Sequence, residues 1–517
     1  MDVISAFGQG LAAFPDRACF VMGEQSWSYR ETGSLIQRVA NRLATEDLGE
    51  GAQGAVLSPN DAIAFTCVFG ILKAGMSWVP LNAKNTADNN RYLCDAFDAR
   101  IVFYHSSMSE MIKEIRPALP KVENFICLDR QIAGGPSLES WLGDITDVVA
   151  NTKQDPEGMC MILPTGGTTG MPKGAMLSRK SLSVFNRTML ELCPHDEPPV
   201  YLAAAPLTHA AGLIAFPIMA KGGTTVITAS PDPLNLMELV DKHQVTDLFL
   251  PPTVIYMMLA HPRVREFDYS SLRYFIYGAA PMSVTKLKEA LEVFGPVMTQ
   301  FFGQSEAPCT CCHLSPAEHL LNGTPAPDSV LSSCGRATPY VELAVLDENG
   351  DPMPDGERGE LAVRSDLVMM GYYKNPEATA EASVRGWHLT GDIAVKDTEG
   401  YFHLVDRKKD MIITGGFNVF STEVEQAVLS HEAVQDCAVI GVPDDKWGEA
   451  VKAIVQLRAG TAATESDLVK HAKSLLGSVK TPKTIEIWED LPRSTVGKVL
   501  KRDIRNKFWA GRGRGIN

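Results

Sequence analysis

The chain has 517 residues, of which 45% are hydrophobic and 21% charged, and its net charge is −14. This length predicts about three domain-sized units. The acidic balance argues against a nucleic-acid partner, because binding a phosphate backbone needs clustered Lys and Arg. No apolar run reaches the roughly 18 residues of a membrane-spanning helix, so we expect no membrane span.

The eleven cysteines follow no disulfide-scaffold spacing, and the N-terminal MDVISAFGQG lacks the basic segment of a secretory signal. A reducing, cytoplasmic location is therefore expected. The sequence CTCCH (residues 309–313) contains Cys309, Cys311, Cys312 and His313. Zinc is the less favoured interpretation, because neighbouring side chains point in different directions and no distant second ligand pair is evident.

In chain order, short apolar runs alternate with segments whose apolar spacing is near 3.6 residues. This alternation predicts an α/β fold with largely parallel sheets covered on both faces. Between residues 336 and 364, short β-like runs and turns predict a small β-rich subdomain. The expected strands include residues 54–58, 99–104, 224–229 and 246–255, and the expected helices include 29–44 and 234–243.

The pattern changes after residue 405, which predicts an N-terminal domain over residues 1–405 and a C-terminal domain over 406–517. The charged segment 406–410 is the expected linker. A helix is predicted over 421–429, with Ser421 or Thr422 as its N-cap. Two strands and a helix over 465–476 follow, so the C-terminal lobe is expected to be α+β.

The loop TGGTTGMPKG (residues 165–174) lies between a buried-strand pattern and a helix start. Its glycines allow successive N–H groups to converge on an anion, its threonines add hydroxyl donors and its lysine adds charge. It is not a Walker A loop, because Lys173 follows a proline and precedes a glycine. Taken alone, the loop fits a phosphate site and an ordinary turn equally well. The residues concerned are Thr165, Gly166, Gly167, Thr168, Thr169, Gly170 and Lys173.

Further motifs follow in order: GAAPM at 278–282, QFFGQSE at 300–306, HLTGD at 388–392, DRKKD at 406–410 and Gly497-Lys498. Over nearly its whole length the chain resembles the adenylate-forming superfamily of acyl-CoA synthetases, adenylation domains and beetle luciferases. The resemblance implies a large N-terminal lobe of α/β subdomains and a small α+β lobe on a hinge. It also implies an ATP-dependent carboxylic acid–CoA ligase that uses Mg²⁺, with coenzyme A as co-substrate.

The resemblance assigns roles to individual residues. The glycine-rich loop is expected to close over the β- and γ-phosphates, with Thr168 and Lys173 among the catalytic groups, and Lys498 to bridge the substrate carboxylate and the α-phosphate. Glu306 is the expected magnesium-associated carboxylate. Phe302 replaces the usual adenine-stacking tyrosine and Ser305 the usual threonine. The other nucleotide-binding positions are Gly278, Ala279, Ala280, Pro281, Gly303 and, at the ribose, Asp392 and Arg407.

For the second step, the resemblance implies that the C-terminal lobe rotates about a hinge at Lys409. The expected coenzyme A contacts are Gly415, Gly416, Phe417 and Trp447, and the expected acyl-pocket residues are His209, Ala210 and Gly212. A fatty acid is the favoured substrate, with aryl and alicyclic acids left open. A carrier protein or oxygen as acceptor, and a silent nucleotide-binding protein, are the alternatives. The resemblance is also compatible with a homodimer.

Overall fold

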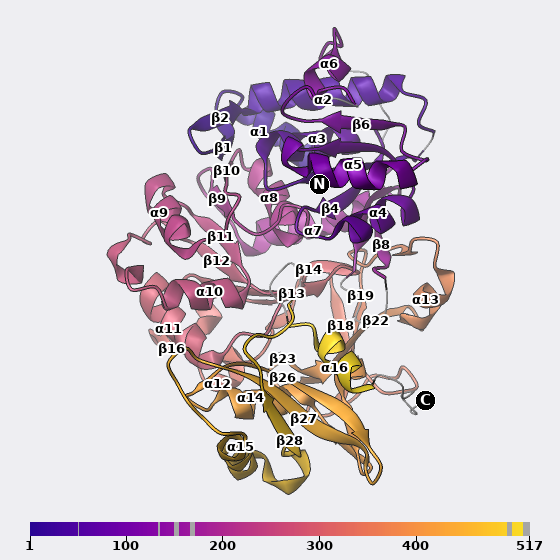
Figure 1. Ribbon diagram of the computed structural model, residues 1–517. Coiled ribbons are helices and arrows are strands. Elements are labelled where there is room, and N and C mark those ends of the chain that lie inside the picture. Colours follow the sequence, from indigo (N-terminus) through magenta and orange to yellow (C-terminus); the bar gives the residue numbers. More distant parts are fainter. Residues whose placement is uncertain (50, 133–134, 149–154, 166–170, 494–498, 510–517) are drawn as a thin grey trace. The chain divides into compact units, whose positions relative to one another are not determined.

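Two sheets built mainly of parallel strands organise the first part of the chain, as predicted (Figure 1). In the nine-stranded sheet, β1, β10, β9, β11, β12 and β13 run parallel, and β2, β14 and β17 are antiparallel additions. The order is β17 (Arg336–Ala337), β14 (Ala307–Leu314), β13 (Met298–Gln304), β12 (Tyr274–Tyr277), β11 (Asp247–Leu250), β9 (Val200–Ala203), β10 (Thr224–Ile227), β1 (Ala18–Met22) and β2 (Gln25–Ser28).

The second sheet has seven strands, and its central strands are again parallel. At one side, β7 and β8 form an antiparallel pair whose connection is the glycine-rich loop, and β20 pairs antiparallel with β8. The order is β20 (Gly371–Tyr372), β8 (Gly174–Ser178), β7 (Met159–Pro164), β4 (Ser77–Asn82), β3 (Gln53–Ser58), β5 (Ala99–Tyr104) and β6 (Asn124–Cys127).

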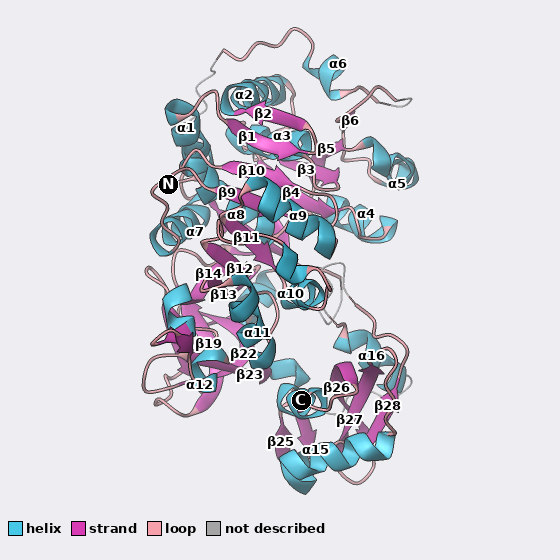
Figure 2. Cartoon of the chain, turned by 90° about the vertical axis from the view of Figure 1, so that its left-hand side faces the viewer, coloured by secondary structure: helices cyan, strands magenta, loops and turns pink. Residues whose placement is uncertain are grey.

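The helices cover both faces of both sheets (Figure 2). They are α1 (Val3–Ala13), α2 (Tyr29–Thr45), α3 (Ala62–Lys73), α4 (Ala87–Ala96), α5 (Ser109–Ile115), α6 (Leu138–Leu142), α7 (Arg179–Leu192), α8 (Ala210–Ala220), α9 (Pro233–His243), α10 (Pro252–Leu259), α11 (Val284–Phe294), α12 (Asp328–Leu331) and α13 (Pro376–Glu381). A short hairpin pairs β15 (Leu320–Leu321) with β16 (Thr324–Pro325).

The period of two along each strand divides the core into layers. In β3, Val56 joins a central core with α1, α2, α3, α7 and α8, whereas Ala55 and Leu57 join the core beneath α4 and α5. In β9, Tyr201 faces the central core and Leu202 faces α9, α10 and α11. Helix α3 is buried on nearly all sides, which explains its lack of a polar face.

A five-stranded sheet has the order β18 (Glu342–Leu346), β19 (Arg358–Arg364), β22 (Trp387–Lys396) and β21 (Ser383–Val384), with β23 (Phe402–Arg407) on β22. The predicted β-rich subdomain corresponds to its first two strands. The structure describes residues 1–49, 51–132, 135–148, 155–165, 171–493 and 499–509. The chain divides into two compact units, the second comprising mainly residues 344–362 and everything from 389 onward. The predicted boundary after residue 405 falls inside β23 and remains a prediction.

The C-terminal part of the second unit is a sheet with helices on both faces. Its order is β25 (Phe417–Val419), β24 (Ile412–Thr414), β27 (Gly448–Leu457) and β26 (Val434–Asp444), with β28 (Thr484–Ile487) parallel to β27. Helices α14 (Ser421–Leu429) and α15 (Glu465–Lys480) pack on one face against Cys437 and Val439. Helix α16 (Lys501–Trp509) packs on the other, against Ala438 and Ile440.

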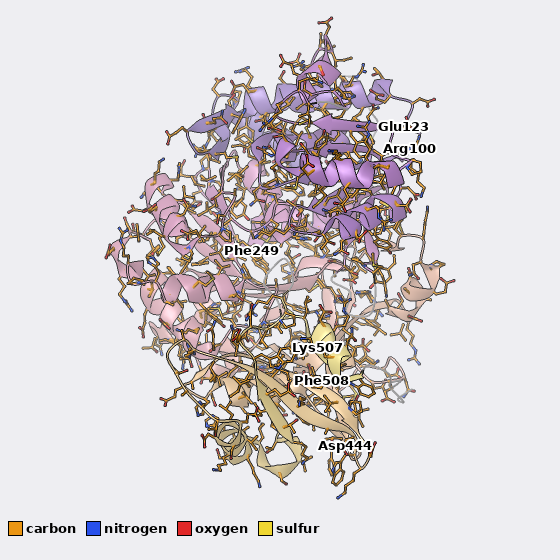
Figure 3. The ribbon with its side chains drawn as sticks, in the orientation of Figure 1. Arg100, Glu123, Phe249, Asp444, Lys507 and Phe508 are labelled. Carbon is orange, nitrogen blue, oxygen red and sulfur yellow. The ribbon has the colours of Figure 1, made fainter. Side chains whose placement is uncertain are left out.

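Cation–aromatic contacts and one hydrogen bond fasten α16 to this sheet. The ammonium of Lys507 lies 4.1 Å from the ring centroid of Trp488, and that of Lys452 lies 4.7 Å from the ring of Phe508. Trp509 Nε1 donates to the carbonyl of Gly441 at 2.9 Å. Figure 3 labels Lys507 and Phe508 on α16 and Asp444 at the end of β26. These contacts hold the C-terminal half of α16 against the sheet.

Two local predictions were wrong. Residues 246–255 are not one apolar strand: β11 ends at Leu250 and α10 begins at Pro252, because a proline at the first position of a helix needs no N–H partner. Neither Ser421 nor Thr422 is the N-cap of α14. Phe420 occupies that position, and the Ser421 hydroxyl instead donates to Asp406 Oδ1 at 2.9 Å. Among the described residues, no helix has the length and apolarity needed to cross a bilayer.

Beside Asp406 lies a buried ionic cluster. Lys501 Nζ, at the start of α16, is 2.8 Å from both Glu425 Oε1 and Ser421 Oγ. Burial raises the pKa of Glu425 and that of Asp406, although Lys501 opposes both shifts. Burial works to lower the pKa of Lys501, but Glu425, Asp406 and Asp410 together raise it. One ammonium therefore stabilises two buried carboxylates between α14, β23 and α16.

We expect Lys501→Met to destabilise the second unit strongly, because removing one partner of a buried ion pair costs roughly 3–5 kcal/mol. In differential scanning calorimetry of the full chain, the unfolding transition of the second unit should occur at a lower temperature than in the wild type. Lys507→Met, on the same helix, removes only an exposed contact with an aromatic ring and should shift that transition little. Equal shifts for the two variants would contradict this account.

Candidate functional site

The structure describes the two ends of the glycine-rich loop. Gly166, Gly167, Thr168, Thr169 and Gly170 lie outside the described residues. At the entrance, the N–H of buried Thr165 donates to the carbonyl of Lys173 at 2.8 Å. At the exit, a Cβ on Gly174 would lie 2.5 Å from Ile162 and 2.8 Å from Phe97. A glycine is therefore required there, and the hairpin fixes the position of Lys173.

Glu306 is a buried carboxylate, only 8% exposed, in the turn between β13 and β14. Tyr372, at the end of β20, donates its O–H to Glu306 Oε1 at 2.7 Å. The ammonium of Lys173 lies 4.5 Å from the centroid of the Tyr372 ring. The structure therefore brings Lys173 and Glu306, both predicted, into one site through Tyr372, which sequence reasoning missed. The segment GYYKNP (residues 371–376), which contains Tyr372, is the sequence feature that could have pointed to it.

The segment Gly278–Pro281 follows β12, at the carboxyl end of the parallel strands, where α/β sheets commonly bind ligands. A Cβ on Gly278 would lie 2.5 Å from the carbonyl oxygen of Phe301 on the neighbouring strand. Ala279 has φ +64°, a left-handed conformation that costs a non-glycine residue about 1 kcal/mol. The chain is thus held in a strained turn at this edge.

Phe302, Gly303 and Ser305 lie at the β13–β14 end of the same sheet. Phe302 is partly buried against the central core. A Cβ on Gly303 would lie 2.4 Å from the backbone nitrogen of Cys309, so the hairpin requires glycine. The Ser305 hydroxyl donates to the carbonyl of Pro164 at 3.4 Å, which links this hairpin to the strand that leads into the glycine-rich loop.

His209 immediately precedes α8, which begins with Ala210. Its Nε2 lies 3.4 Å from Asn82 Nδ2, at the end of β4. Burial lowers the pKa of His209 to about 4, so the imidazole is neutral near pH 7. A Cβ on Gly212 would lie 2.0 Å from the carbonyl oxygen of Leu207. The small side chains here therefore allow close backbone packing, and His209 supplies a neutral polar wall.

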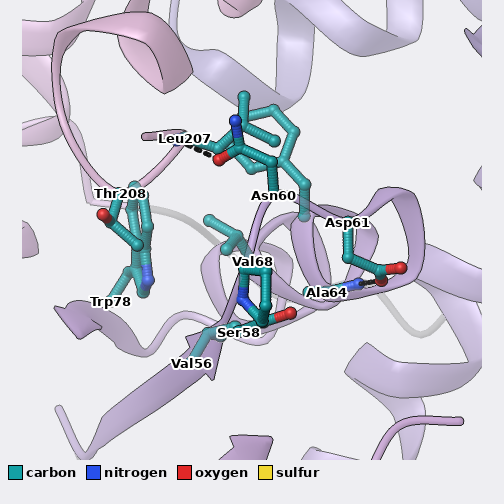
Figure 4. Close-up of a pocket in the computed structure, with 11 residues that line it drawn as sticks. Val56, Ser58, Asn60, Asp61, Ala64, Val68, Trp78, Leu207 and Thr208 are labelled. Carbon is teal, nitrogen blue, oxygen red and sulfur yellow. Dashed lines mark hydrogen bonds between the residues drawn. The ribbon is translucent and has the colours of Figure 1, made fainter. Parts of the chain in front are cut away.

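A small cavity lies beside residues 207 and 208, which directly precede His209 (Figure 4). Among its lining residues, Asn60 accepts a hydrogen bond from the N–H of Leu207 at 2.9 Å. Its Nδ2 also donates to the carbonyls of Ala205 and Thr228, at 3.0 and 3.1 Å. One amide thus holds the ends of two neighbouring strands and the backbone that leads to His209. No motif marked Asn60 in the sequence.

Asp392 and Arg407, both predicted to contact the ribose, face each other on paired strands of the second unit. Arg407 Nε lies 2.6 Å from Asp392 Oδ1, and Asp392 is 5% exposed. Next to this pair, Glu360 accepts from the N–H of Gly391 at 3.1 Å and pairs with Lys408 at 2.8 Å. Glu360 therefore fixes the turn before Asp392. Lys409 follows in a short 3₁₀ turn.

The predicted coenzyme A residues also lie together within the second unit. The N–H of Gly415 donates to the carbonyl of Trp447 at 2.9 Å, and a Cβ on Gly415 would lie 2.5 Å from the indole. Phe417 and Trp447 are 60% and 42% exposed, and the Lys446 ammonium lies 4.6 Å from the indole centroid. This surface combines exposed aromatic rings with a cation. Lys498 lies outside the described residues.

A magnesium ion fits Glu306 by donor chemistry, because Mg²⁺ prefers oxygen ligands and usually combines one or two carboxylates with water and substrate phosphates. In the described part of the chain, no three His, Cys, Asp or Glu residues form a metal-binding cluster.

The cysteines of CTCCH lie on β14, where successive side chains point to opposite faces of the strand. Cys312 Sγ lies 3.6 Å from Cys334 Sγ, and His313 stacks on Phe301 with centroids 4.5 Å apart.

The lowered pKa of His209 predicts a pH-dependent stability. Since the folded-state pKa is about 4 and the ordinary value 6.5, the stability contributed by neutral His209 is present above pH 6.5 and lost as the pH falls towards 4. Melting temperatures between pH 7 and pH 4.5 should therefore fall more steeply for the wild type than for His209→Gln. Parallel curves would show that the pKa of His209 is the same in the folded and the unfolded chain, which would contradict this prediction.

Two family models match the chain. The model described as AMP-binding enzyme matches residues 7–373, and the model described as AMP-binding enzyme C-terminal domain matches 423–498. A medium/long-chain fatty acid–CoA ligase of Mycobacterium tuberculosis is 38% identical over 70% of this chain and 63% of its own length. A feruloyl-CoA synthase of an Amycolatopsis species is 32% identical over 97% of this chain and 99% of its own.

Among solved structures, ATP-bound MatB from Rhodopseudomonas palustris superposes with a TM-score of 0.88 at 27% identity, covering 99% of both chains. The match therefore extends over both units of the fold as well as over the motifs. The chain belongs to the AMP-binding enzyme family, within the acyl-CoA synthetase (acid–thiol ligase) branch of the adenylate-forming superfamily.

Proposed function

We propose that this protein is an ATP-dependent carboxylic acid–CoA ligase that works through an acyl-adenylate and releases pyrophosphate. The observation that carries this proposal is the grouping of Glu306, Tyr372 and Lys173 beside the glycine-rich hairpin. A buried carboxylate and a cation at such a loop suit a polyphosphate bound with a divalent metal.

In the first half-reaction, the substrate carboxylate attacks the α-phosphorus of ATP, so two anions must approach each other. At about 4 Å and an effective dielectric constant near 20, such a like-charge contact costs roughly 4 kcal/mol. Lys498 offsets this repulsion by bridging the carboxylate and the α-phosphate, and Lys173 with the loop amides stabilises the departing pyrophosphate. Glu306 would hold Mg²⁺, which when bound neutralises phosphate charge. Asp392 accepts hydrogen bonds from the ribose, oriented by Arg407.

In the second half-reaction, a thiolate displaces AMP from the acyl-adenylate: the carbon–sulfur bond forms as the bond between the acyl carbon and the phosphate oxygen breaks. Gly415 and Gly416 have φ of +57° and +80°. The indole of Trp447 covers Gly415, whereas an added Cβ on Gly416 would meet nothing within 4 Å, so a ligand can approach the backbone of this turn at Gly416. Phe417 and Trp447 supply exposed rings beside this turn. Rotation about Lys409 exchanges this surface for the one that carries Lys498.

For the acid, we propose a fatty acid, consistent with the small residues after His209 and with the neutral state of its imidazole. An aryl acid is the second candidate, because the relative named feruloyl-CoA synthase matches over 97% of the chain. Transfer to a carrier protein is the alternative second step. We further propose a cytoplasmic location, and a homodimer stays a prediction.

The proposed function is tested by incubating the protein with ATP, Mg²⁺, coenzyme A and a panel of fatty and aryl acids. Formation of AMP, pyrophosphate and an acyl thioester is expected, and ADP as the product would contradict the mechanism. Lys498→Ala should abolish acyl-adenylate formation while leaving thioester formation from supplied acyl-adenylate largely intact. Equal loss in both half-reactions would argue against the role given to Lys498.

Asn60→Asp should raise the KM for the acid by about fivefold or more, because the substitution removes two donated hydrogen bonds that hold the backbone before His209. The KM for ATP should change less. Asn41→Asp is a matched control, since Asn41 Nδ2 also donates to two carbonyls, those of Thr146 and Val148, from helix α2. If both variants change the acid KM equally, Asn60 has no specific role in the pocket.

A further inference from the structure

Tyr372 lies between the two charged groups of the proposed phosphate site and contacts each with a different part of its ring system. Its hydroxyl donates to Glu306 Oε1 at 2.7 Å, whereas its ring face meets the Lys173 ammonium at 4.5 Å. A phenol is suited to this double contact, because the O–H is a hydrogen-bond donor and the ring face carries partial negative charge. Phenylalanine would retain only the second contact.

Tyr372 is an uncharged donor to this carboxylate. The side chain is buried, and a phenol donates its O–H without carrying a charge. Tyr372 therefore orients the Glu306 carboxylate without cancelling its negative charge, which stays available for a cation.

The Lys173 ammonium is also kept available. In the described part of the chain, its contact is with the Tyr372 ring, and no carboxylate lies within ion-pair distance of it. A direct Lys173–Glu306 ion pair would neutralise both groups and would have to be broken before a metal-bound phosphate could enter. The ring of Tyr372 separates the two charges while it contacts both.

Hydrogen bonds on both sides of Tyr372 hold it in this position. Its own N–H donates to Thr379 Oγ1 at 2.8 Å, and the N–H of Tyr373 donates to the carbonyl of Gly174 at 2.8 Å. The N–H of Met369 donates to the carbonyl of Glu306 at 2.7 Å. The segment around Tyr372 is thus attached to the backbone of Glu306 and to the end of the glycine-rich hairpin, one residue from Lys173.

We propose that Tyr372 is a positioning residue for ATP binding: it orients Glu306 towards a divalent cation and prevents Lys173 from pairing with that carboxylate. The identity of the ligands rests on the proposed function. The positioning role itself concerns only how the metal and ATP bind, so it can be measured in the absence of acid and coenzyme A.

The test uses Tyr372→Phe and, as a matched control, Tyr373→Phe. The neighbouring Tyr373 also donates its O–H to a carboxylate at 2.7 Å, but that carboxylate belongs to Asp98, which has no assigned role in the reaction. Isothermal titration calorimetry with ATP, once with Mg²⁺ and once with EDTA, separates metal-dependent from metal-independent binding. Glu306→Gln and the double variant with Tyr372→Phe complete a mutant cycle.

We expect Tyr372→Phe to weaken binding of ATP with Mg²⁺ by about tenfold or more, because a hydrogen bond to a buried charged group is lost. Binding in EDTA should change less than about twofold, since the ring contact with Lys173 is retained. Tyr373→Phe should alter neither measurement. In the Glu306→Gln background, Tyr372→Phe should add little, because the charge that the hydroxyl orients is then absent.

Equal weakening with and without Mg²⁺, or the same effect from Tyr373→Phe, would overturn the proposal, because either result indicates a general structural role. Failure of the proposed function would look different. In that case the wild type would bind ATP but form no AMP with any acid, while the calorimetric difference between Tyr372→Phe and Tyr373→Phe would still be measurable.

Discussion

The negative charge of Glu306 is the constraint on which the first unit's site depends. A carboxylate that is 8% exposed has lost most of its hydration, and such a group is stable only if hydrogen bonds or a nearby cation compensate it. Here one neutral donor, Tyr372, provides part of this compensation, and the cation that comes with the substrate would provide the rest. Strand β20 carries this donor and, by pairing with β8, holds it beside Glu306.

Uncharged polar groups also line the predicted acyl pocket around His209. His209 is neutral because it is buried, and Asn82 and Asn60 contribute amides rather than ionised groups. In the second unit the opposite solution is used: Asp392 is paired directly with Arg407, and Glu360 with Lys408. The groups expected to contact phosphate are thus left unneutralised, whereas those expected to contact the uncharged ribose are fixed by ion pairs.

The fold class could be predicted from the sequence, because the motifs are local and their order is informative. For instance, the structure confirms the predicted bounds of strand β5 and helix α9 to within one residue. The same motifs name Lys173 and Glu306, which the structure brings together at Tyr372, while the roles of these residues stay predictions. Tyr372 and Asn60 could not be predicted, because their contacts join segments 66 and about 145 residues apart. The N-cap of α14 was wrong for a related reason: the Ser421 hydroxyl bonds to Asp406, which lies 15 residues earlier, rather than to its own helix.

The all-round burial of α3 has a consequence for how the chain is made. Its core partners include α8, where the ring of Phe216 packs against the rings of Phe65 and Phe69 on α3. At ribosomal rates of roughly 5–20 residues per second, an interval on the order of 7–30 s separates synthesis of α3 from synthesis of this part of α8. During that interval an apolar helix with no polar face is left uncovered. The nascent chain should therefore depend on chaperones at this helix more than at any amphipathic helix of the first unit.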